Sequence, residues 1–255
     1  MESVNGSLNG RLALVTGAAS GVGRAIASSL AGRGASILAV DFDGDRTRTL
    51  TRTIGGESLV ADLSNPAAVE SMELECRPID ILVNCAGVQH VAPIEDFDPT
   101  RFEQIYRLML LAPFLLTQAV LPGMYERGWG RLIHVSSVHG HRASAYKSAY
   151  VSAKHGLEGL SKVIAVEGAN RGVTSNTVSP GYVRTPLIDG QIADQARRHG
   201  IREEEVVRDV LLSRTPLKRL IEPEEVGNLV AFLCGPGTDL ITGSSYIIDG
   251  GWSAT

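Results

Sequence analysis

Seven short runs of aliphatic and β-branched residues alternate along this chain with longer amphipathic stretches. The runs are at 12–16, 36–40, 58–61, 79–84, 132–136, 173–178 and 246–248. Several are continuously apolar, which is typical of strands buried on both faces of a parallel sheet. The stretches at 22–33, 45–53, 67–76, 101–125, 149–170 and 224–233 have the spacing of helices that bury one face. This alternation predicts an α/β fold: a Rossmann-type, doubly wound, seven-stranded parallel sheet with helices on both faces.

Composition narrows the class further. A chain of 255 residues suits one α/β domain spanning residues 1–255, and 44% hydrophobic residues exclude a disordered chain. The net charge of −4, without a basic run, predicts no nucleic-acid partner. The three cysteines (Cys76, Cys85 and Cys234) have no metal-ligand spacing, so we expect no metal and predict buried, reduced thiols.

The chain offers no targeting or membrane signal. Its first residues lack the basic start and apolar stretch of a signal peptide. The most apolar segment, 108–121, is interrupted by Pro113, Thr117 and Gln118 and is shorter than a bilayer requires. We therefore expect a cytoplasmic protein with no membrane partner.

One segment departs from the alternation. Residues 185–216, between the sixth and seventh strands, are polar and helical in pattern. An insertion at the carboxyl edge of such a sheet is a candidate substrate lid. A solvated helical pair that serves only for packing is an equally open interpretation.

A glycine-rich turn, TGAASGVG at 16–23, joins the first strand directly to a helix. Glycines there allow a tight turn and a close approach of pyrophosphate to the helix N-terminus, although the spacing is GxxxGxG rather than GxGxxG. Asp41 follows the second strand, where a carboxylate can accept both ribose hydroxyls and would repel the 2′-phosphate of NADP. These features predict NAD as the cofactor.

Tyr150 and Lys154 are four residues apart on a predicted helix and so share one face. An ammonium there stabilises a phenolate, so Tyr150 could act as a general base below its usual pKa near 10. Ser137, at the end of the fifth strand, could hold the substrate oxygen. Taken alone, a YxxxK pair can also be a surface pair.

These motifs together resemble the short-chain dehydrogenase/reductase family over essentially the whole chain. The resemblance is carried by TGAASGVG, Asp62-Leu63, NCAG at 84–87, Ser137, YVSAK at 150–154, PGYVRT at 180–185 and IDGGW at 248–252. It implies NAD(P)-linked alcohol and ketone chemistry with Ser137, Tyr150 and Lys154 as catalytic residues, and a homotetramer.

The resemblance also implies the coenzyme site. Asp62 and Leu63 would lie at the adenine, residues 84–87 along the cleft and residues 180–185 on the nicotinamide side. The full expected set is Thr16, Gly17, Ser20, Gly21, Val22, Gly23, Asp41, Asp62, Leu63, Asn84, Ala86, Gly87, Tyr150, Lys154, Pro180, Gly181, Val183 and Thr185.

The chain departs from the family pattern at two positions. Met109 stands where the family has a catalytic Asn, and Cys85 replaces the second Asn of NNAG. In the family, the water relay to the lysine is held by the backbone carbonyl at the first of these positions. Our hypothesis is that Met109 keeps the relay and loses only the side-chain hydrogen bonds.

Substrate residues are expected near the catalytic helix. Lys147 precedes Tyr150 by three residues and shares its face, and a second cation there favours an anionic substrate. His139, Gln89 and Gln191 add donors suited to a carboxylate close to the reacting hydroxyl. Each of the four could instead be an ordinary surface or loop side chain.

Within the family, the motifs around these residues resemble members that interconvert (R)-3-hydroxybutyrate and acetoacetate. The resemblance therefore implies a small hydroxy or keto acid as substrate. Two alternatives stay open. One is a family enzyme for another secondary alcohol or ketone (a diol, an aryl ketone or a 3-oxoacyl substrate), and the other is a non-catalytic NAD-binding protein.

Overall fold

The computed structural model describes residues 7–255, except for the side chains of Leu187, Gln191, Asp194, Gln195, Arg198 and His199. Its centre is one seven-stranded sheet with the order β3-β2-β1-β4-β5-β6-β7, parallel throughout. The strands are β1 (Leu12–Thr16), β2 (Ser36–Asp41), β3 (Glu57–Val60), β4 (Ile81–Asn84), β5 (Gly130–Val135), β6 (Val173–Pro180) and β7 (Ser245–Ile248). The predicted sheet is confirmed. Its strand order reverses between β1 and β4, where a doubly wound sheet opens its ligand crevice.

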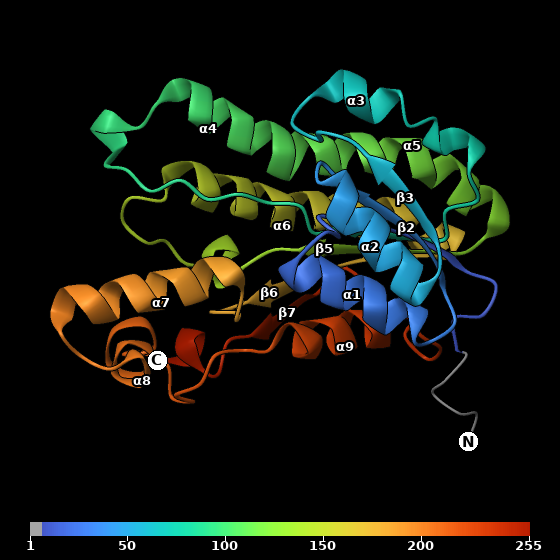
Figure 1. Ribbon diagram of the computed structural model, residues 1–255. Helices are drawn as coiled ribbons and strands as arrows, with labels where there is room; N and C mark the ends of the chain where they lie inside the picture. The colour runs from blue at the N-terminus through green and yellow to red at the C-terminus, as the bar shows by residue number, and fades with distance from the viewer. Residues whose placement is uncertain (1–6) are drawn as a thin grey trace.

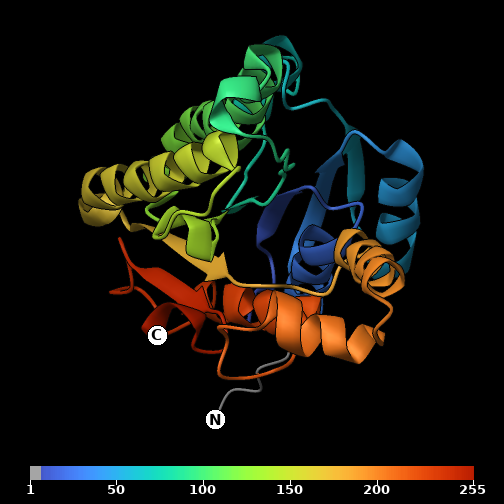
Figure 2. The same cartoon turned by 90° about the vertical axis from the view of Figure 1, so that its left-hand side faces the viewer.

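Helices cover both faces of this sheet (Figures 1 and 2). They are α1 (Gly21–Ala31), α2 (Gly44–Ile54), α3 (Pro66–Glu70), α4 (Pro99–Tyr106), α5 (Ala112–Arg127), α6 (Ser148–Gly168), α7 (Pro186–His199), α8 (Glu203–Glu205) and α9 (Pro223–Leu233). Successive residues of β1 point to opposite faces, as a strand requires. Ala13 and Val15 lie in one core cluster with residues of α1 and α9, and Leu14 lies in another with residues of α5 and α6.

The predicted helix at 101–125 has three parts. A π-helical segment, Arg107–Leu111, connects α4 to α5. The whole run, Pro99–Arg127, is long and apolar enough to cross a membrane by length and composition, in contrast to our expectation for 108–121. In the structure, Leu116, Val120 and Met124 of this run are buried in the core cluster on that face of the sheet.

Two smaller expectations were wrong. The predicted helix at 67–76 divides into α3 and a 3₁₀ turn, Leu74–Cys76, because Glu73 between them adopts a left-handed φ of 48°. Cys76 is exposed rather than buried, whereas Cys234 is buried. A local apolar pattern reports an average tendency, and it does not show where one residue leaves the helical region.

The insertion at 185–216 is helical, as predicted. It contains α7, α8 and a π-helical segment, Val206–Leu211, and its apolar side chains Ile192, Val206 and Leu212 pack with Leu220 in a small core of their own. Figure 1 shows α7 at the left of the molecule, to one side of α1 and α9.

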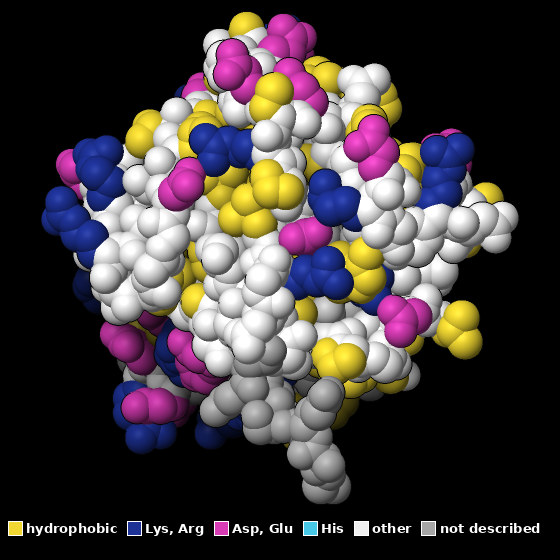
Figure 3. Space-filling view, turned by 90° about the vertical axis from the view of Figure 1, so that its right-hand side faces the viewer, with side chains coloured by type: hydrophobic (Ala, Val, Ile, Leu, Met, Phe, Trp, Pro, Cys, Tyr) yellow, Lys and Arg dark blue, Asp and Glu magenta, His cyan; other side chains and the backbone are white. Residues whose placement is uncertain are grey.

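Charge is dispersed on the face in Figure 3. There, Lys and Arg side chains alternate with Asp and Glu side chains, and hydrophobic groups lie between them.

Candidate active site

The glycine-rich turn after β1 leaves no room for a side chain at Gly17 or at Gly23. A Cβ atom on Gly17 would lie 2.9 Å from the Cα of Ala86, and one on Gly23 would lie 2.1 Å from the carbonyl oxygen of Gly17. Gly17 and Gly21 also have φ values of 67° and 51°, which favour glycine. At these glycines, backbone therefore packs closely against backbone between β1 and α1.

Thr16 joins this turn to the NCAG segment. Its Oγ1 accepts the backbone N–H groups of Cys85 (2.9 Å) and Ala86 (3.1 Å) and donates to the carbonyl of Val83. The side chain is 1% exposed. Thr16 thus fixes the two coenzyme segments relative to each other, and its hydroxyl is already engaged by the protein.

The N-terminus of α1 is suited to an anion. Ser20 is its exposed N-cap, and among the described residues its hydroxyl accepts no N–H of that helix. The first turn carries no acidic residue, so the N–H groups and the helix dipole favour a pyrophosphate. Thr185 lies beside the turn, with its methyl group 3.3 Å from where a Cβ on Gly21 would be.

Asp41 ends β2 next to the turn. Its carboxylate is nearly buried and accepts the N–H groups of Ala19 and Asp43, each at 3.0 Å. These bonds hold the carboxylate at the edge of the sheet where an adenosine ribose would lie. The glycine turn, the free helix end and Asp41 together fit a nicotinamide dinucleotide.

The other expected coenzyme residues lie at the carboxyl ends of β4 and β6 or on the loops after β3, β4 and β6, except Val22, which lies in α1. The exposed Asp62 accepts hydrogen bonds from the backbone N–H and the hydroxyl of Ser64. The Leu63 side chain packs in the core, so an adenine could contact mainly the backbone of Leu63. Nδ2 of Asn84 lies 3.1 Å from Nδ1 of His134. Among the described residues, Oδ1 of Asn84 has no hydrogen-bond partner. The remaining positions are Val22, Ala86, Gly87, Pro180, Gly181 and Val183.

The three predicted catalytic residues converge at β5 and α6. Ser137 follows β5, and its hydroxyl lowers the pKa of the Tyr150 phenol, so the two side chains lie close together. Lys154 is buried, its Nζ lies 5.7 Å from the centre of the Tyr150 ring, and it donates to the carbonyl of Val135 at 2.6 Å. The structure therefore assembles the predicted hydroxyl, phenol and ammonium.

The electrostatics of this group differ from our expectation. Burial raises the pKa of Tyr150 above 10, and the hydrogen bond with Ser137 only partly opposes it. Burial also lowers the pKa of Lys154 to about 8. In this state Lys154 is not the dominant influence on the phenol, because desolvation penalises both charged groups. A bound oxidised nicotinamide, which is cationic, would favour the phenolate.

His139 connects the catalytic serine to the C-terminal segment. Its backbone N–H donates to Ser137 Oγ, its Nε2 is 2.8 Å from Ser144 Oγ, and its ring stacks on Trp252. Burial, together with the charge of Lys147, lowers the pKa of His139 to about 4. His139 is therefore a neutral hydrogen-bonding group near pH 7, not a cation.

Lys147 is the N-cap residue of α6 and is half-buried. Burial lowers its pKa. A cation at a helix N-terminus faces the positive end of the dipole, so the position is unfavourable until an anion meets it. The preceding Tyr146 has a left-handed φ of 68°, a strained conformation of the kind that clusters at functional sites.

The two glutamines are less well placed. Gln89 is exposed on the loop after β4, which is tied to the segment before α6 by the hydrogen bond from Ala92 N–H to the Tyr146 carbonyl (3.0 Å). Gln191 is on α7, and its side chain lies outside the described residues. The predicted contacts of both glutamines with a substrate stay predictions.

Trp252 is the site residue that sequence reasoning missed. It lies in the IDGGW motif, where Asp249 accepts the N–H groups of Gly251 and Ser253 and so shapes the turn around the indole. The motif was available as a signal. Its distance along the chain from Ser137 hid the contact with His139.

Met109 lies in the π-helical segment and is 1% exposed. Its Cε is 3.5 Å from where a Cβ on Gly87 would be, and it packs with Ala149 and Ala153 of α6. The thioether therefore fills the space between the NCAG loop and the catalytic helix. A π-helical turn changes the backbone pairing of α4 and α5 at this residue, which is compatible with a relay through its carbonyl.

Comparisons with known proteins agree with this geometry. A family model described as enoyl-(acyl carrier protein) reductase matches residues 17–253. The D-beta-hydroxybutyrate dehydrogenase of Cupriavidus necator is 43% identical over 97% of this chain and 99% of its own length. A protein of the same name from Rhizobium meliloti is also 43% identical, over 96% of this chain and 99% of its own.

Solved structures share the fold. One from Agrobacterium tumefaciens, assigned as a 2-deoxy-D-gluconate 3-dehydrogenase and solved with bound NADP, has a TM-score of 0.87 and 30% identity, with full coverage of both chains. A short-chain dehydrogenase/reductase family protein also has a TM-score of 0.87, with 32% identity over 98% of this chain and 100% of that one.

Proposed function

This chain belongs to the short-chain dehydrogenase/reductase family, and we propose that it interconverts (R)-3-hydroxybutyrate and acetoacetate with NAD. The observation that carries the choice of substrate is Lys147. Its side chain is half-buried at the N-terminus of α6, three residues before Tyr150, where an anionic group would stabilise the ammonium. The two relatives at 43% identity support the same substrate.

In the proposed reaction, the substrate hydroxyl lies between Ser137 and Tyr150, and Tyr150 removes its proton. The chemistry supplied by a bound nicotinamide coenzyme is the acceptance of a hydride from carbon 3. Ser137 donates to the substrate oxygen and stabilises charge that develops there. Lys154 holds a positive charge near the phenol and binds the nicotinamide ribose.

The carboxylate of the substrate would dock on Lys147, with His139, Gln89 and Gln191 as hydrogen-bonding partners. Because the pKa of His139 is lowered to about 4, Lys147 supplies the charge and His139 supplies orientation. Because the carboxylate lies a few carbons from the reacting hydroxyl, docking it fixes which hydrogen of carbon 3 faces the coenzyme. The binding energy is thus used to orient the substrate. The segment 185–216 would close over the bound substrate and exclude water.

The preference for NAD over NADP rests on Asp41. Its carboxylate is fixed by two backbone N–H groups and leaves little freedom to move away from a 2′-phosphate. The solved relative with bound NADP shows that the fold can accommodate NADP, so the fold alone does not select NAD. Asp41 is therefore the residue on which the preference depends.

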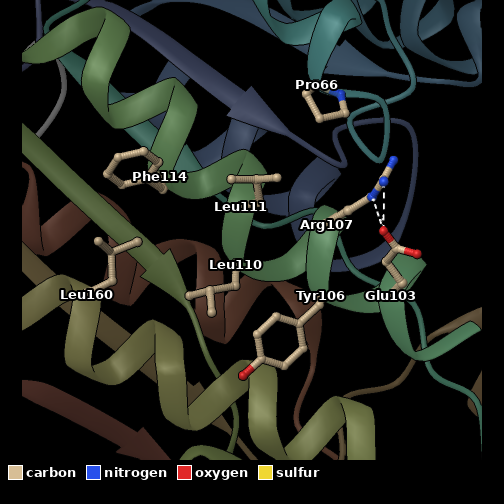
Figure 4. A pocket seen from close by; sticks show the side chains of 8 residues that line it. All are labelled: Pro66, Glu103, Tyr106, Arg107, Leu110, Leu111, Phe114 and Leu160. Atoms are coloured by element: carbon tan, nitrogen blue, oxygen red, sulfur yellow. Dashed lines mark hydrogen bonds and ion pairs between the residues drawn. The ribbon is translucent and has the colours of Figure 1, made fainter. Parts of the chain in front are cut away.

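We further propose a soluble, cytoplasmic homotetramer. A hollow of about 640 Å³ opens on the face formed by α4, α5 and α6, and its lining includes Tyr106, Leu110, Leu111, Phe114 and Leu160 (Figure 4). Phe114 is 45% exposed and Leu111 is 37% exposed, which favours coverage by a second copy of the chain. The variant Phe114→Asp should lower the mass measured by analytical ultracentrifugation while the unaltered protein sediments as a tetramer.

A substrate panel tests the proposed function. NADH formation is followed at 340 nm with (R)- and (S)-3-hydroxybutyrate, a sugar acid, a diol, an aryl alcohol and a 3-hydroxyacyl thioester, each with NAD and with NADP. The proposal expects the highest kcat/KM for (R)-3-hydroxybutyrate with NAD. A neutral alcohol as the best substrate would replace it with the broader family activity, and no turnover of any compound despite NADH binding would favour a non-catalytic protein.

A further inference from the structure

A buried carboxylate lies directly behind the catalytic lysine. Glu158 follows Lys154 by one turn on α6, and its side chain is 7% exposed. It accepts hydrogen bonds from Thr177 Oγ1 (2.8 Å) and Ser179 Oγ (3.0 Å) on β6 and from Ser245 Oγ on β7 (3.5 Å). The residue therefore connects the catalytic helix to the edge of the sheet away from the coenzyme turn.

The structure keeps space for this carboxylate and closes its outer side with a histidine. His141 Nε2 lies 3.3 Å from Glu158 Oε1 and 2.9 Å from Ser245 Oγ. A Cβ on Gly140 would lie 3.1 Å from Glu158 Oε1 and 2.5 Å from Ser136 Oγ. A larger residue at position 140 would thus displace one or the other.

Hydrogen bonds from hydroxyl groups alone do not compensate for the desolvation of a buried carboxylate. Hydroxyl groups donate hydrogen bonds but carry no opposite charge, and a buried ion is costly unless it is also paired. Lys154 likewise lacks an opposite charge in its hydrogen bond, because its ammonium is buried and donates to the neutral carbonyl of Val135. Each group thus offers the other a counter-charge within one helical turn.

Other titratable groups face Lys154, but they are neutral where it titrates. Burial raises the pKa of Cys85, on the loop after β4, to about 12, and lowers that of His134, on β5, to about 3. Burial also raises the pKa of Tyr150, on α6 itself. Among the described residues, Glu158 is therefore the carboxylate that opposes the loss of charge on Lys154.

We propose that Glu158 is a positioning residue that keeps Lys154 charged for catalysis, with His141 screening the carboxylate from solvent. The proposal rests on the proposed alcohol oxidation by Tyr150 and Lys154. It acts through Lys154, since Glu158 itself lies one helical turn beyond the reacting groups.

The test is the pH profile of Glu158→Gln, which removes the charge and keeps the size. A nearby carboxylate stabilises the ammonium and raises its pKa, so its removal lowers that pKa. The alkaline limb of kcat for alcohol oxidation should then move to lower pH by about one unit, a loss of about tenfold at a fixed pH on that limb. Near pH 6, where Lys154 keeps its proton in both proteins, kcat should agree within about twofold.

Three controls separate this effect from damage to the fold. Glu158→Asp keeps the charge and should restore the limb, and Ser245→Ala removes only a hydroxyl and should leave the limb in place. Glu158→Met provides a second neutral side chain, so whichever neutral variant retains a cooperative melting transition decides the question. Alkaline limbs that coincide in wild type and a folded neutral variant would overturn the proposal.

The design also separates this proposal from the proposed function. If the wild type oxidises another alcohol better than 3-hydroxybutyrate, the substrate assignment fails, and the same profiles are recorded with that alcohol. If the wild type oxidises 3-hydroxybutyrate and the limb does not move, only the role of Glu158 fails. A matched binding readout is the affinity for NADH, measured by fluorescence as a function of pH. As pH rises, this affinity should fall at a lower pH in the neutral variant than in the wild type.

Discussion

The two sides of the cleft are built differently. On the coenzyme side, Thr16 and Asp41 have their polar atoms paired with backbone groups before any ligand binds. On the catalytic side, burial raises the pKa of Tyr150 and lowers those of Lys154 and His139. The coenzyme side is therefore preformed, whereas burial on the catalytic side disfavours the charged forms of groups that a bound coenzyme and substrate would stabilise.

The largest effect should come from Tyr150→Phe, which removes the proton acceptor of the catalytic side. Turnover should fall by about a thousandfold, within the usual range for general acid–base catalysis. The dissociation constant for NADH, measured by fluorescence titration, should change far less, because the variant removes one hydroxyl of the expected coenzyme set and leaves the glycine-rich turn and Asp41 in place. An equal loss of NADH binding would show that the two sides do not act separately.

Asp41→Ser tests the coenzyme side. The serine keeps a hydrogen-bonding group near Ala19 but removes the charge that opposes a 2′-phosphate. The ratio of kcat/KM for NAD over that for NADP should fall by about a hundredfold, as expected for lost hydrogen bonds to a charged group. The KM for the hydroxy acid at saturating coenzyme should stay within about twofold of its original value.

Lys147→Met tests the charge at the substrate rim. The KM for 3-hydroxybutyrate should rise by about ten- to thirtyfold, the loss expected for one charge-assisted hydrogen bond. In the wild type, the pKa of Lys147 is lowered by burial, so KM should rise as pH increases through that pKa and the ammonium loses its proton. The variant should lack this rise, and a variant with the wild-type pH dependence would contradict the assignment.

The smallest effect on turnover should come from Met109→Asn. If the backbone carbonyl carries the relay, kcat should change by less than about threefold. The melting temperature should fall, because the amide would enter a cluster with Ile105, Ala149 and Ala153. A rise in kcat by orders of magnitude would show that the Asn side chain found at this position in the family contributes to catalysis.

Sequence reasoning located most of this fold and the reacting groups because both depend on local patterns. The seven apolar runs match the seven strands within about two residues, the scatter normal for such boundaries. Ser137, Tyr150 and Lys154 meet because strand and helix periods place them on facing elements. These patterns repeat over a few residues, so they can be recognised without knowledge of the tertiary packing.

The missing parts depend on tertiary burial. The sign of the Tyr150 pKa shift was wrong because the desolvation of a phenol is set by elements far away in the chain. Trp252 was missed because its contact with His139 spans more than one hundred residues. The π-helical segment at Met109 has the same apolar pattern as an ordinary helix, so hydrophobic spacing could not reveal it.

The hydrogen bonds of Thr16 have a consequence for protein engineering. One hydroxyl holds Cys85 and Ala86 against the glycine-rich turn, and the backbone of Ala86 approaches Gly17 too closely for a side chain. A coenzyme loop from a relative with different nucleotide preference is therefore not an interchangeable module. A chimera that exchanges residues 16–23 should need residues 84–87 from the same donor, since the two segments have a shared surface and must be transplanted as one piece.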